Sequence, residues 1–165
     1  MRNVAVSLNA DNRIEIRVGT ESRAGESYYL GLQPDSDSHE FCPAHGVAQL
    51  LREWIRLLSE MKEGQQLFLP FDFSDEYTRW VTVHREGSDV SIVFGWATVE
   101  GWAISPCDLT QFAHGLPGFV PDEPLCAQTF YLPNVLSGLR HSLAVVVEGS
   151  LPRRAEGVNP PRKAT

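Results

Sequence analysis

Residues 79–96 read RWVTVHREGSDVSIVFGW, and this stretch decides the fold. Apolar and polar side chains alternate on both sides of Gly87-Ser88, which has the residue types of a two-residue turn. With this pair as the turn, Val83 faces Ile92 across the two strands. A shift by one residue would break the match, so the sequence predicts an antiparallel hairpin in a fixed register. The apolar face of the hairpin holds Val81, Val83, Val90, Ile92, Phe94 and Trp96.

The other face of this hairpin places Trp80 across from Gly95. An aromatic ring that covers a glycine on the neighbouring strand is a known way to fix strand pairing. This pair supports the same register as the apolar face does.

Residues 44–62 carry the second strong signal. Apolar side chains recur there at the spacing of one helix face, namely at Val47, Leu50, Leu51, Trp54, Ile55, Leu58 and Met61. Such a stripe is typical of an amphipathic α-helix. Gly64 suits the position just after a helix ends. The sequence predicts a long helix over 44–62 that packs on a sheet.

Weaker patterns place the remaining elements. Alternation predicts strands at 4–8 and 14–18, at 28–32 and at 66–73. Pro70 favours an edge position for the last of these. Ser105-Pro106-Cys107-Asp108 has the residue types of a helix start. Pro133 opens a last helix, and 145–147 either continues it or forms a strand.

Strands and helices are segregated along the chain, which favours an α+β fold over a doubly wound one. We expect a mainly antiparallel sheet of about five to seven strands, the helix 44–62 packed on it, and two shorter C-terminal helices. The chain has 165 residues. We expect residues 1–148 to form a single globular domain and residues 149–165 to form a basic, proline-rich, flexible tail.

Composition and charge exclude several classes of protein. With 42% hydrophobic and 21% charged residues, the chain is neither fully disordered, nor a collagen, nor a coiled coil. Residues 1–148 carry 10 basic and 20 acidic side chains, a net charge of −10. An acidic body argues against nucleic-acid binding, because phosphate contacts need lysine and arginine. It permits a basic protein as partner.

The sequence also bears on location. No signal peptide and no membrane span is expected, and the three cysteines, Cys42, Cys107 and Cys126, do not form a disulfide framework. Arginine far outnumbers lysine, which is typical of a GC-rich bacterial genome. We expect a cytoplasmic bacterial protein.

Three carboxylates cluster in the stretch 72–77, between two predicted strands. Asp72, Asp75 and Glu76 lie there, with Trp80 just beyond. The carboxylates could cap backbone N–H groups of a solvated turn, present negative charge beside a tryptophan anchor to a partner, or hold a hard cation. The spacing does not match a calcium-binding loop, and no metal is predicted here.

A second stretch, Trp96-Ala-Thr-Val-Glu100-Gly101-Trp102, sets two tryptophans around an acidic residue and a glycine. The rings could pack in the core or form the wall of a groove. Gly101 indicates a bulge or a close backbone approach.

His39, Cys42 and His45 are residue types that bind zinc, and Cys107 or Cys126 could complete a site. The paired spacings of zinc knuckles are missing and Pro43 stiffens the segment. A polar loop that leads into the helix is the favoured interpretation, so no cofactor is predicted.

The sequence has no nucleophile elbow, no glycine-rich phosphate loop and no His-Glu-x-x-His motif. No stretch matches a known family. In overall character, as a small, acidic, single-domain protein without catalytic motifs, the chain is similar to bacterial toxin-immunity proteins, which neutralise a basic toxin by covering its active site. We therefore predict a non-enzymatic module that binds one basic protein through Asp72, Asp75, Glu76, Trp80, Glu100 and Trp102.

Two other interpretations stay open. The chain could bind a small molecule or be an enzyme, with a pocket between sheet and helix lined by Trp54, Trp96 and Trp102. It could also form a homodimer through an exposed strand edge at 66–73.

Overall fold

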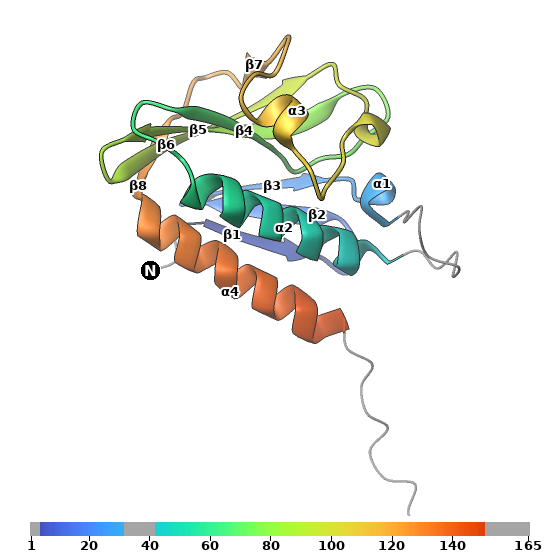
Figure 1. The fold of residues 1–165 in the computed structure, drawn as a ribbon. Coiled ribbons are helices and arrows are strands. Elements are labelled where there is room, and N and C mark those ends of the chain that lie inside the picture. Colours follow the sequence, from blue (N-terminus) through green and yellow to red (C-terminus); the bar gives the residue numbers. More distant parts are fainter. Residues whose placement is uncertain (1–3, 32–41, 151–165) are drawn as a thin grey trace, which may run out of the picture.

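The computed structural model describes residues 4–31 and 42–150 (Figure 1). Its eight strands form two antiparallel sheets. The three-stranded sheet has the order β1-β2-β3, with β1 at Val4–Leu8, β2 at Ile14–Val18 and β3 at Glu21–Gly25. The second sheet has the order β4-β5-β6-β7, and β8 also pairs with β6. Its strands are β4 at Gln66–Pro70, β5 at Thr78–Glu86, β6 at Asp89–Ala97, β7 at Val120–Pro121 and β8 at Gln128–Tyr131.

The predicted α+β class is confirmed, with a long helix on antiparallel strands. The strands are divided between two sheets instead of forming one. Helices α2 (Pro43–Ser59) and α4 (Leu132–Ser150) run side by side, and α4 lies along β1 (Figure 1). Two short helices, α1 (Tyr28–Gly31) and α3 (Thr110–Ala113), and a 3-10 turn, η1 (Gly101–Ala103), complete the described elements.

The β5–β6 hairpin has the predicted register. Val83 pairs with Ile92, Val81 with Phe94, and Trp80 with Gly95. The side chain that covers Gly95 is Phe119, however, because a Cβ on Gly95 would lie 2.3 Å from the Phe119 ring. The alternation along the strands therefore fixes the pairing, as expected, while a later loop supplies the covering ring.

Helix α2 begins at Pro43, so a proline lies in its first turn. The helix ends at Ser59, three residues before the predicted end. Met61 is buried just beyond the helix. Gly64 has a φ of 71° and donates its N–H to the carbonyl of Arg85 at 3.0 Å, so it starts the approach to β4. The apolar stripe thus extends past the end of the helix, because Met61 is buried although it is not helical.

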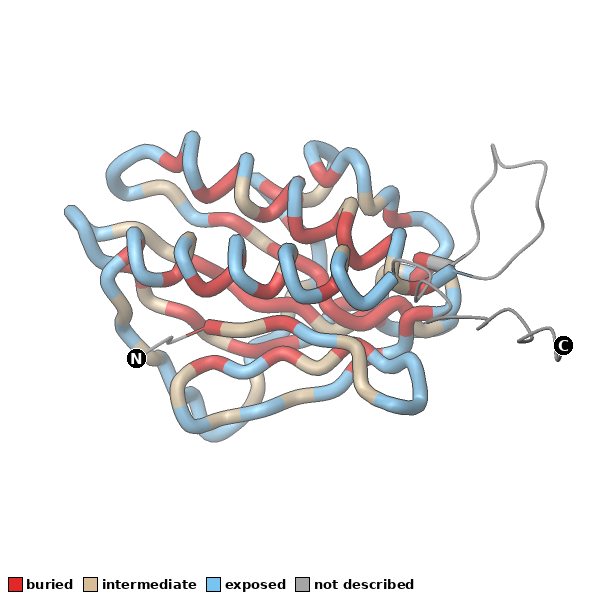
Figure 2. The backbone as a smooth tube through the Cα atoms, turned by 90° about the horizontal axis from the view of Figure 1, so that it is seen from below, coloured by how far each residue is buried: buried red, intermediate tan, exposed pale blue. Residues whose placement is uncertain are grey.

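The core lies between the two sheets and the inner faces of α2 and α4, where the buried residues concentrate (Figure 2). Trp54 of α2, Ile14 and Ile16 of β2, and Leu67 and Leu69 of β4 are among the most buried side chains. The burial of side chains of this size is the main stabilising contribution to the fold.

The predicted strand at 28–32 is wrong. Residues 28–31 form helix α1, and residue 32 lies outside the described residues. The third strand is β3, within a stretch that was expected to be a loop. No apolar alternation marks this strand, since Glu21, Ser22 and Arg23 are all polar. Hydrogen bonding to β2 holds these residues at the sheet edge.

The helix start expected at Ser105 is also wrong. Ser105 forms an isolated bridge with Asp108, and α3 begins at Thr110. The helix therefore begins four residues later than predicted. The Asp108 carboxylate, just before it, accepts the N–H of Thr110, the first residue of the helix, at 3.0 Å.

The last helix is longer than expected. Helix α4 has 19 residues, against 17 in α2, and it continues through 145–147. Most of the predicted tail, 151–165, lies outside the described residues. Within the part of the chain that the structure describes, no helix has both the length and the apolar character of a membrane span.

Candidate protein-binding surface

The stretch after β4 is anchored by alternate buried phenylalanines. Phe71 and Phe73 are fully buried. The Phe71 N–H donates to the carbonyl of Arg79 at 2.9 Å, and the Phe73 N–H donates to the carbonyl of Glu26 at 3.0 Å. These contacts fix the backbone, so the residues that follow are presented from a rigid base.

Asp72 has a structural role. Its side chain is 8% exposed and accepts the Glu26 N–H at 2.8 Å and the Ser74 hydroxyl at 2.7 Å. The carboxylate thus caps a backbone donor and a neighbouring hydroxyl, one of the roles considered from the sequence. Asp72 also lines the hollow described below.

Asp75, Glu76 and Tyr77 are exposed at the tip of this stretch. The Tyr29 hydroxyl donates a hydrogen bond to Asp75, and this bond raises the pKa of Tyr29 above its usual value. Among residues 4–31 and 42–150, no ion pair involves Asp75 or Glu76. Their negative charge is therefore open to an outside partner.

The second acidic stretch lies against the first. The Gly101 N–H donates to the Ser74 carbonyl at 2.7 Å. A Cβ on Gly101 would lie 2.4 Å from the Phe73 carbonyl, so only glycine permits this close approach. Of the two roles predicted for Gly101, a bulge or a close backbone approach, the structure has the second. Glu100 and Trp102 flank this glycine and are both exposed, Trp102 at 65%.

Aromatic rings lie beside these carboxylates. Tyr77 is 53% exposed, and its ring centroid lies 6.0 Å from that of Trp96 in an edge-to-face arrangement. The two rings line an open hollow of about 530 Å³ together with Asp72, Ser74, Asp75, Glu76 and Arg79. We call the exposed residues Asp75, Glu76, Tyr77, Trp96, Glu100 and Trp102 the acidic-aromatic surface.

Trp80 does not belong to this surface, which corrects the prediction. Its side chain is fully buried, its indole N–H donates to the Thr78 hydroxyl at 2.7 Å, and its ring lies 5.8 Å from that of Phe112. Alternation along β5 places Trp80 on the face opposite Arg79 and Val81. Trp80 is close in sequence to the acidic residues, but its side chain points to the other face of the sheet.

The pocket predicted between sheet and helix is not formed as expected. Among the described residues, the buried Trp54 lines a cavity of about 10 Å³ in the core, which is about the size of one water molecule. Trp96 and Trp102 are exposed on the acidic-aromatic surface instead. The three tryptophans therefore do not line one site for a small molecule.

The zinc candidates are dispersed. Cys42 and His45 are exposed, His39 lies outside the described residues, and Cys107 and Cys126 are exposed and free. No three histidine, cysteine or carboxylate side chains within the described ranges gather in a way that could hold a metal ion.

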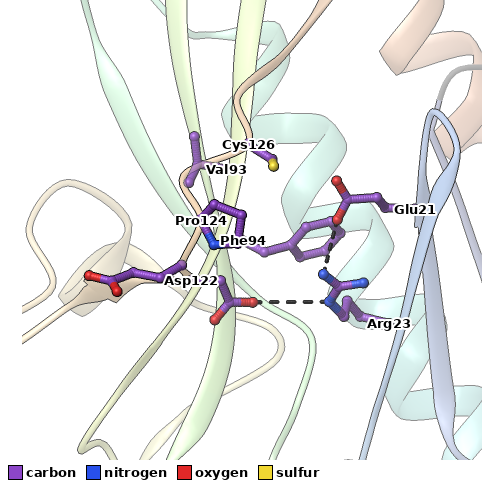
Figure 3. Close-up of a pocket in the computed structure, with 8 residues that line it drawn as sticks. Glu21, Arg23, Val93, Phe94, Asp122, Pro124 and Cys126 are labelled. Atoms are coloured by element: carbon purple, nitrogen blue, oxygen red, sulfur yellow. Dashed lines mark hydrogen bonds and ion pairs between the residues drawn. The ribbon is translucent and has the colours of Figure 1, made fainter.

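A second hollow, of about 360 Å³, was not found from the sequence. Glu21 and Arg23 of β3 point toward Asp122 and Phe94 there (Figure 3). Arg23 lies 3.0 Å from the Glu21 carboxylate, 4.0 Å from that of Asp122 and 5.2 Å from the Phe94 ring centroid. Glu21 and Arg23, two charged residues on one face of β3, are the feature of the sequence that could indicate this hollow. The sequence does not predict it, because it does not predict the strand.

An ion pair separates the two hollows. Arg79, which lines the first hollow, donates to Asp122 of the second at 2.6 Å. The two hollows therefore adjoin each other, on the side of β6 that carries Phe94 and Trp96.

Comparison with models of protein families and with curated protein sequences gives no match for this chain. Among solved structures, the chain is similar to a chain of the CdiA-CT/CdiI toxin and immunity complex from Enterobacter cloacae. The TM-score is 0.49 and the identity is 12%, over 88% of this chain and 99% of that chain. A similarity of this degree assigns no function.

Proposed function

We propose that this chain is a protein-binding module whose acidic-aromatic surface docks a basic protein. The observation that carries the proposal is the hydrogen bond between Gly101 and Ser74, which joins two acidic stretches into one surface. Asp75, Glu76 and Glu100 bring three carboxylates together, and none of them takes part in an ion pair within the described residues.

The exposed aromatic rings support the same function. Tryptophan and tyrosine are the residues most often found where an interface concentrates its binding energy. Trp102 exposes 65% of its surface and Tyr77 exposes 53%, and the carboxylates beside them take part in no ion pair within the described residues. A partner that presents lysine and arginine around an apolar centre would match both the rings and the charge.

The sharpest form of this proposal is an immunity-type inhibitor that covers the active site of a basic toxin. It is supported by the small size and by the net charge of −10 over residues 1–148. A negative surface would also accelerate the encounter with a positively charged partner.

The test is affinity capture of the tagged full chain from a lysate of its own host, with washes at low and high salt. One basic protein should remain at low salt and be identified by mass spectrometry. Asp75→Lys/Glu76→Lys should lose it, whereas Glu86→Lys/Asp89→Lys should retain it. The control pair changes the net charge by the same amount, but at the turn end of the β5–β6 hairpin, and both residues are exposed there. Equal capture by both variants would contradict the proposal.

A further inference from the structure

One edge of the three-stranded sheet is closed by a helix. The outer edge of β1 faces α4, where the Val6 N–H donates to the Ser142 hydroxyl oxygen at 3.0 Å. Gly138 lets the helix approach the strand, because a Cβ there would lie 2.2 Å from the Val4 carbonyl oxygen. The fold thus supplies a specific partner for the backbone on this side.

The opposite edge, along β3, is closed at its end by contacts of Glu26. Glu26 follows β3, and its N–H donates to the Asp72 carboxylate at 2.8 Å, while its carbonyl accepts the Phe73 N–H at 3.0 Å. The peptide groups of Glu26 therefore point away from β2. Because peptide groups alternate in direction along an antiparallel strand, those of Ser22 and Ala24 point the same way.

Ser22 and Ala24 have no backbone partner on that side among the described residues. Within residues 4–31 and 42–150, no group pairs with the outward N–H of Ser22 or Ala24, and the Ser22 carbonyl accepts only the Arg23 guanidinium at 3.1 Å. Both side chains are exposed and small. An edge with open donors and acceptors is the structure to which an extended peptide can add as a further strand.

The hollows on one side of this edge are lined by more carboxylates than guanidinium groups. The neighbouring residues Glu21 and Arg23 line the hollow of Figure 3, which adjoins the hollow of the acidic-aromatic surface. Two guanidinium groups, Arg23 and Arg79, line these hollows. The carboxylates that line them are those of Glu21, Asp72, Asp75, Glu76, Asp122 and Glu123.

We propose that the outer edge of β3 at Ser22 and Ala24 is a docking edge that takes one extended, basic segment of a partner protein as a fourth strand. Alternate side chains of that segment would project on the same side as Arg23 and so enter the acidic hollows, which fits lysine or arginine. A second copy of this chain fits less well, because it would bring two acidic regions together. The positive charge of the segment rests on the proposed function, whereas the strand pairing rests on the edge itself.

The experiment measures amide hydrogen exchange by NMR on the full chain, with and without a nine-residue peptide in which lysine and valine alternate. The bound peptide should slow exchange at Ser22 and Ala24 by about tenfold or more, because open amides become hydrogen-bonded. The Val6 amide, which is already bonded to Ser142, should not change. A form of the peptide that is N-methylated at every residue keeps its charge, but the methyl groups replace its amide hydrogens and keep its backbone from lying against the edge. This form should give no protection.

Variants at position 24 provide a second readout. Ala24→Pro removes the outward N–H without removing a bond to β2, and it should weaken binding of the peptide about five- to tenfold, the loss expected for one hydrogen bond. Ala24→Ser keeps the N–H and should bind like the wild type. The inference is overturned if the peptide fails to bind at millimolar concentration, binds without protecting Ser22 and Ala24, or binds equally well when N-methylated.

The two proposals can fail separately. If Asp75→Lys/Glu76→Lys abolishes capture of a basic protein but the peptide leaves Ser22 and Ala24 unprotected, strand addition alone is wrong. If the peptide protects these amides while the charge reversal leaves capture intact, the acidic-aromatic surface alone is wrong.

Discussion

The Gly101 amide donates a hydrogen bond of 2.7 Å to the Ser74 carbonyl and so joins two acidic stretches that are separated by the whole β5–β6 hairpin. A side chain at position 101 would collide with the carbonyl group of Phe73. The surface therefore depends on a glycine that itself presents no functional group.

Gly101→Ala should disturb this contact. A Cβ would lie 2.4 Å from the Phe73 carbonyl, so the backbone has to shift, at an expected cost of about 1–3 kcal/mol in the free energy of unfolding. Denaturant unfolding measures the cost. Gly115→Ala is the control, because a Cβ at position 115 meets no atom within 4 Å. Equal stability of the two variants would show that the approach at Gly101 is not tight.

Substitution of Trp102 should affect binding, whereas substitution of Trp80 should affect the stability of the fold. Trp102→Ala should change stability by no more than about 0.5 kcal/mol, since the ring is 65% exposed. It should weaken the complex with a captured partner by about 2 kcal/mol or more, as for an interface anchor. Trp80→Ala should cost about 3–5 kcal/mol of stability, because the ring is fully buried. Unfolding curves and a binding titration separate the two effects, and an unchanged affinity in Trp102→Ala would remove this residue from the surface.

Glu53 should make stability depend on pH in the acid range. The Arg56 guanidinium donates to its two carboxylate oxygens at 2.7 and 2.8 Å and lowers the pKa of Glu53. A lowered pKa means that this stabilisation is present above the unfolded-state value of about 4.3 and is lost as the pH falls through the folded-state value. Unfolding measured between pH 7 and pH 3 should show a smaller acid loss in Glu53→Gln than in the wild type.

The matched control for Glu53 is Glu60, which pairs with the same Arg56 at 2.9 Å but has 64% of its side chain exposed. Glu60→Gln should change stability by about 0.5 kcal/mol or less, because exposed ion pairs contribute little. If both variants change the free energy of unfolding equally across this pH range, the burial of Glu53 does not strengthen its ion pair with Arg56.

The hydrogen bond from Tyr29 to Asp75 should be visible in a titration of tyrosine absorbance. It raises the pKa of Tyr29, since it holds the proton on the hydroxyl beside a carboxylate. Asp75→Ala should therefore let Tyr29 ionise at lower pH. Tyr29→Phe identifies the transition, and a titration that is unchanged in Asp75→Ala would exclude the interaction.

The sequence predicts those parts of the fold whose side chains repeat with a clear period. The register of the β5–β6 hairpin and the position of α2 follow from such patterns, and both are confirmed. Strand β3 escapes prediction because Glu21, Ser22 and Arg23 are polar, and pairing with β2 holds them in the sheet.

The candidate surface is only partly predictable for a related reason. The acidic residues and Trp102 stand out by composition, and Gly101 indicates a bulge or a close backbone approach. The sequence does not show that the partner in this approach is the carbonyl of Ser74. The assignment of Trp80 to the surface fails because its neighbours in sequence, and not its face of the strand, suggested it. Tyr29 and Tyr77 contribute through contacts that only the fold creates.

The central claim is that the acidic-aromatic surface binds a basic protein. The most direct measurement is calorimetric titration of the captured, purified partner against the full chain and its two charge-reversal variants, at low and high salt. Asp75→Lys/Glu76→Lys should weaken binding strongly, most of all at low salt, while Glu86→Lys/Asp89→Lys should bind like the wild type. Equal affinity for all three chains would contradict the claim.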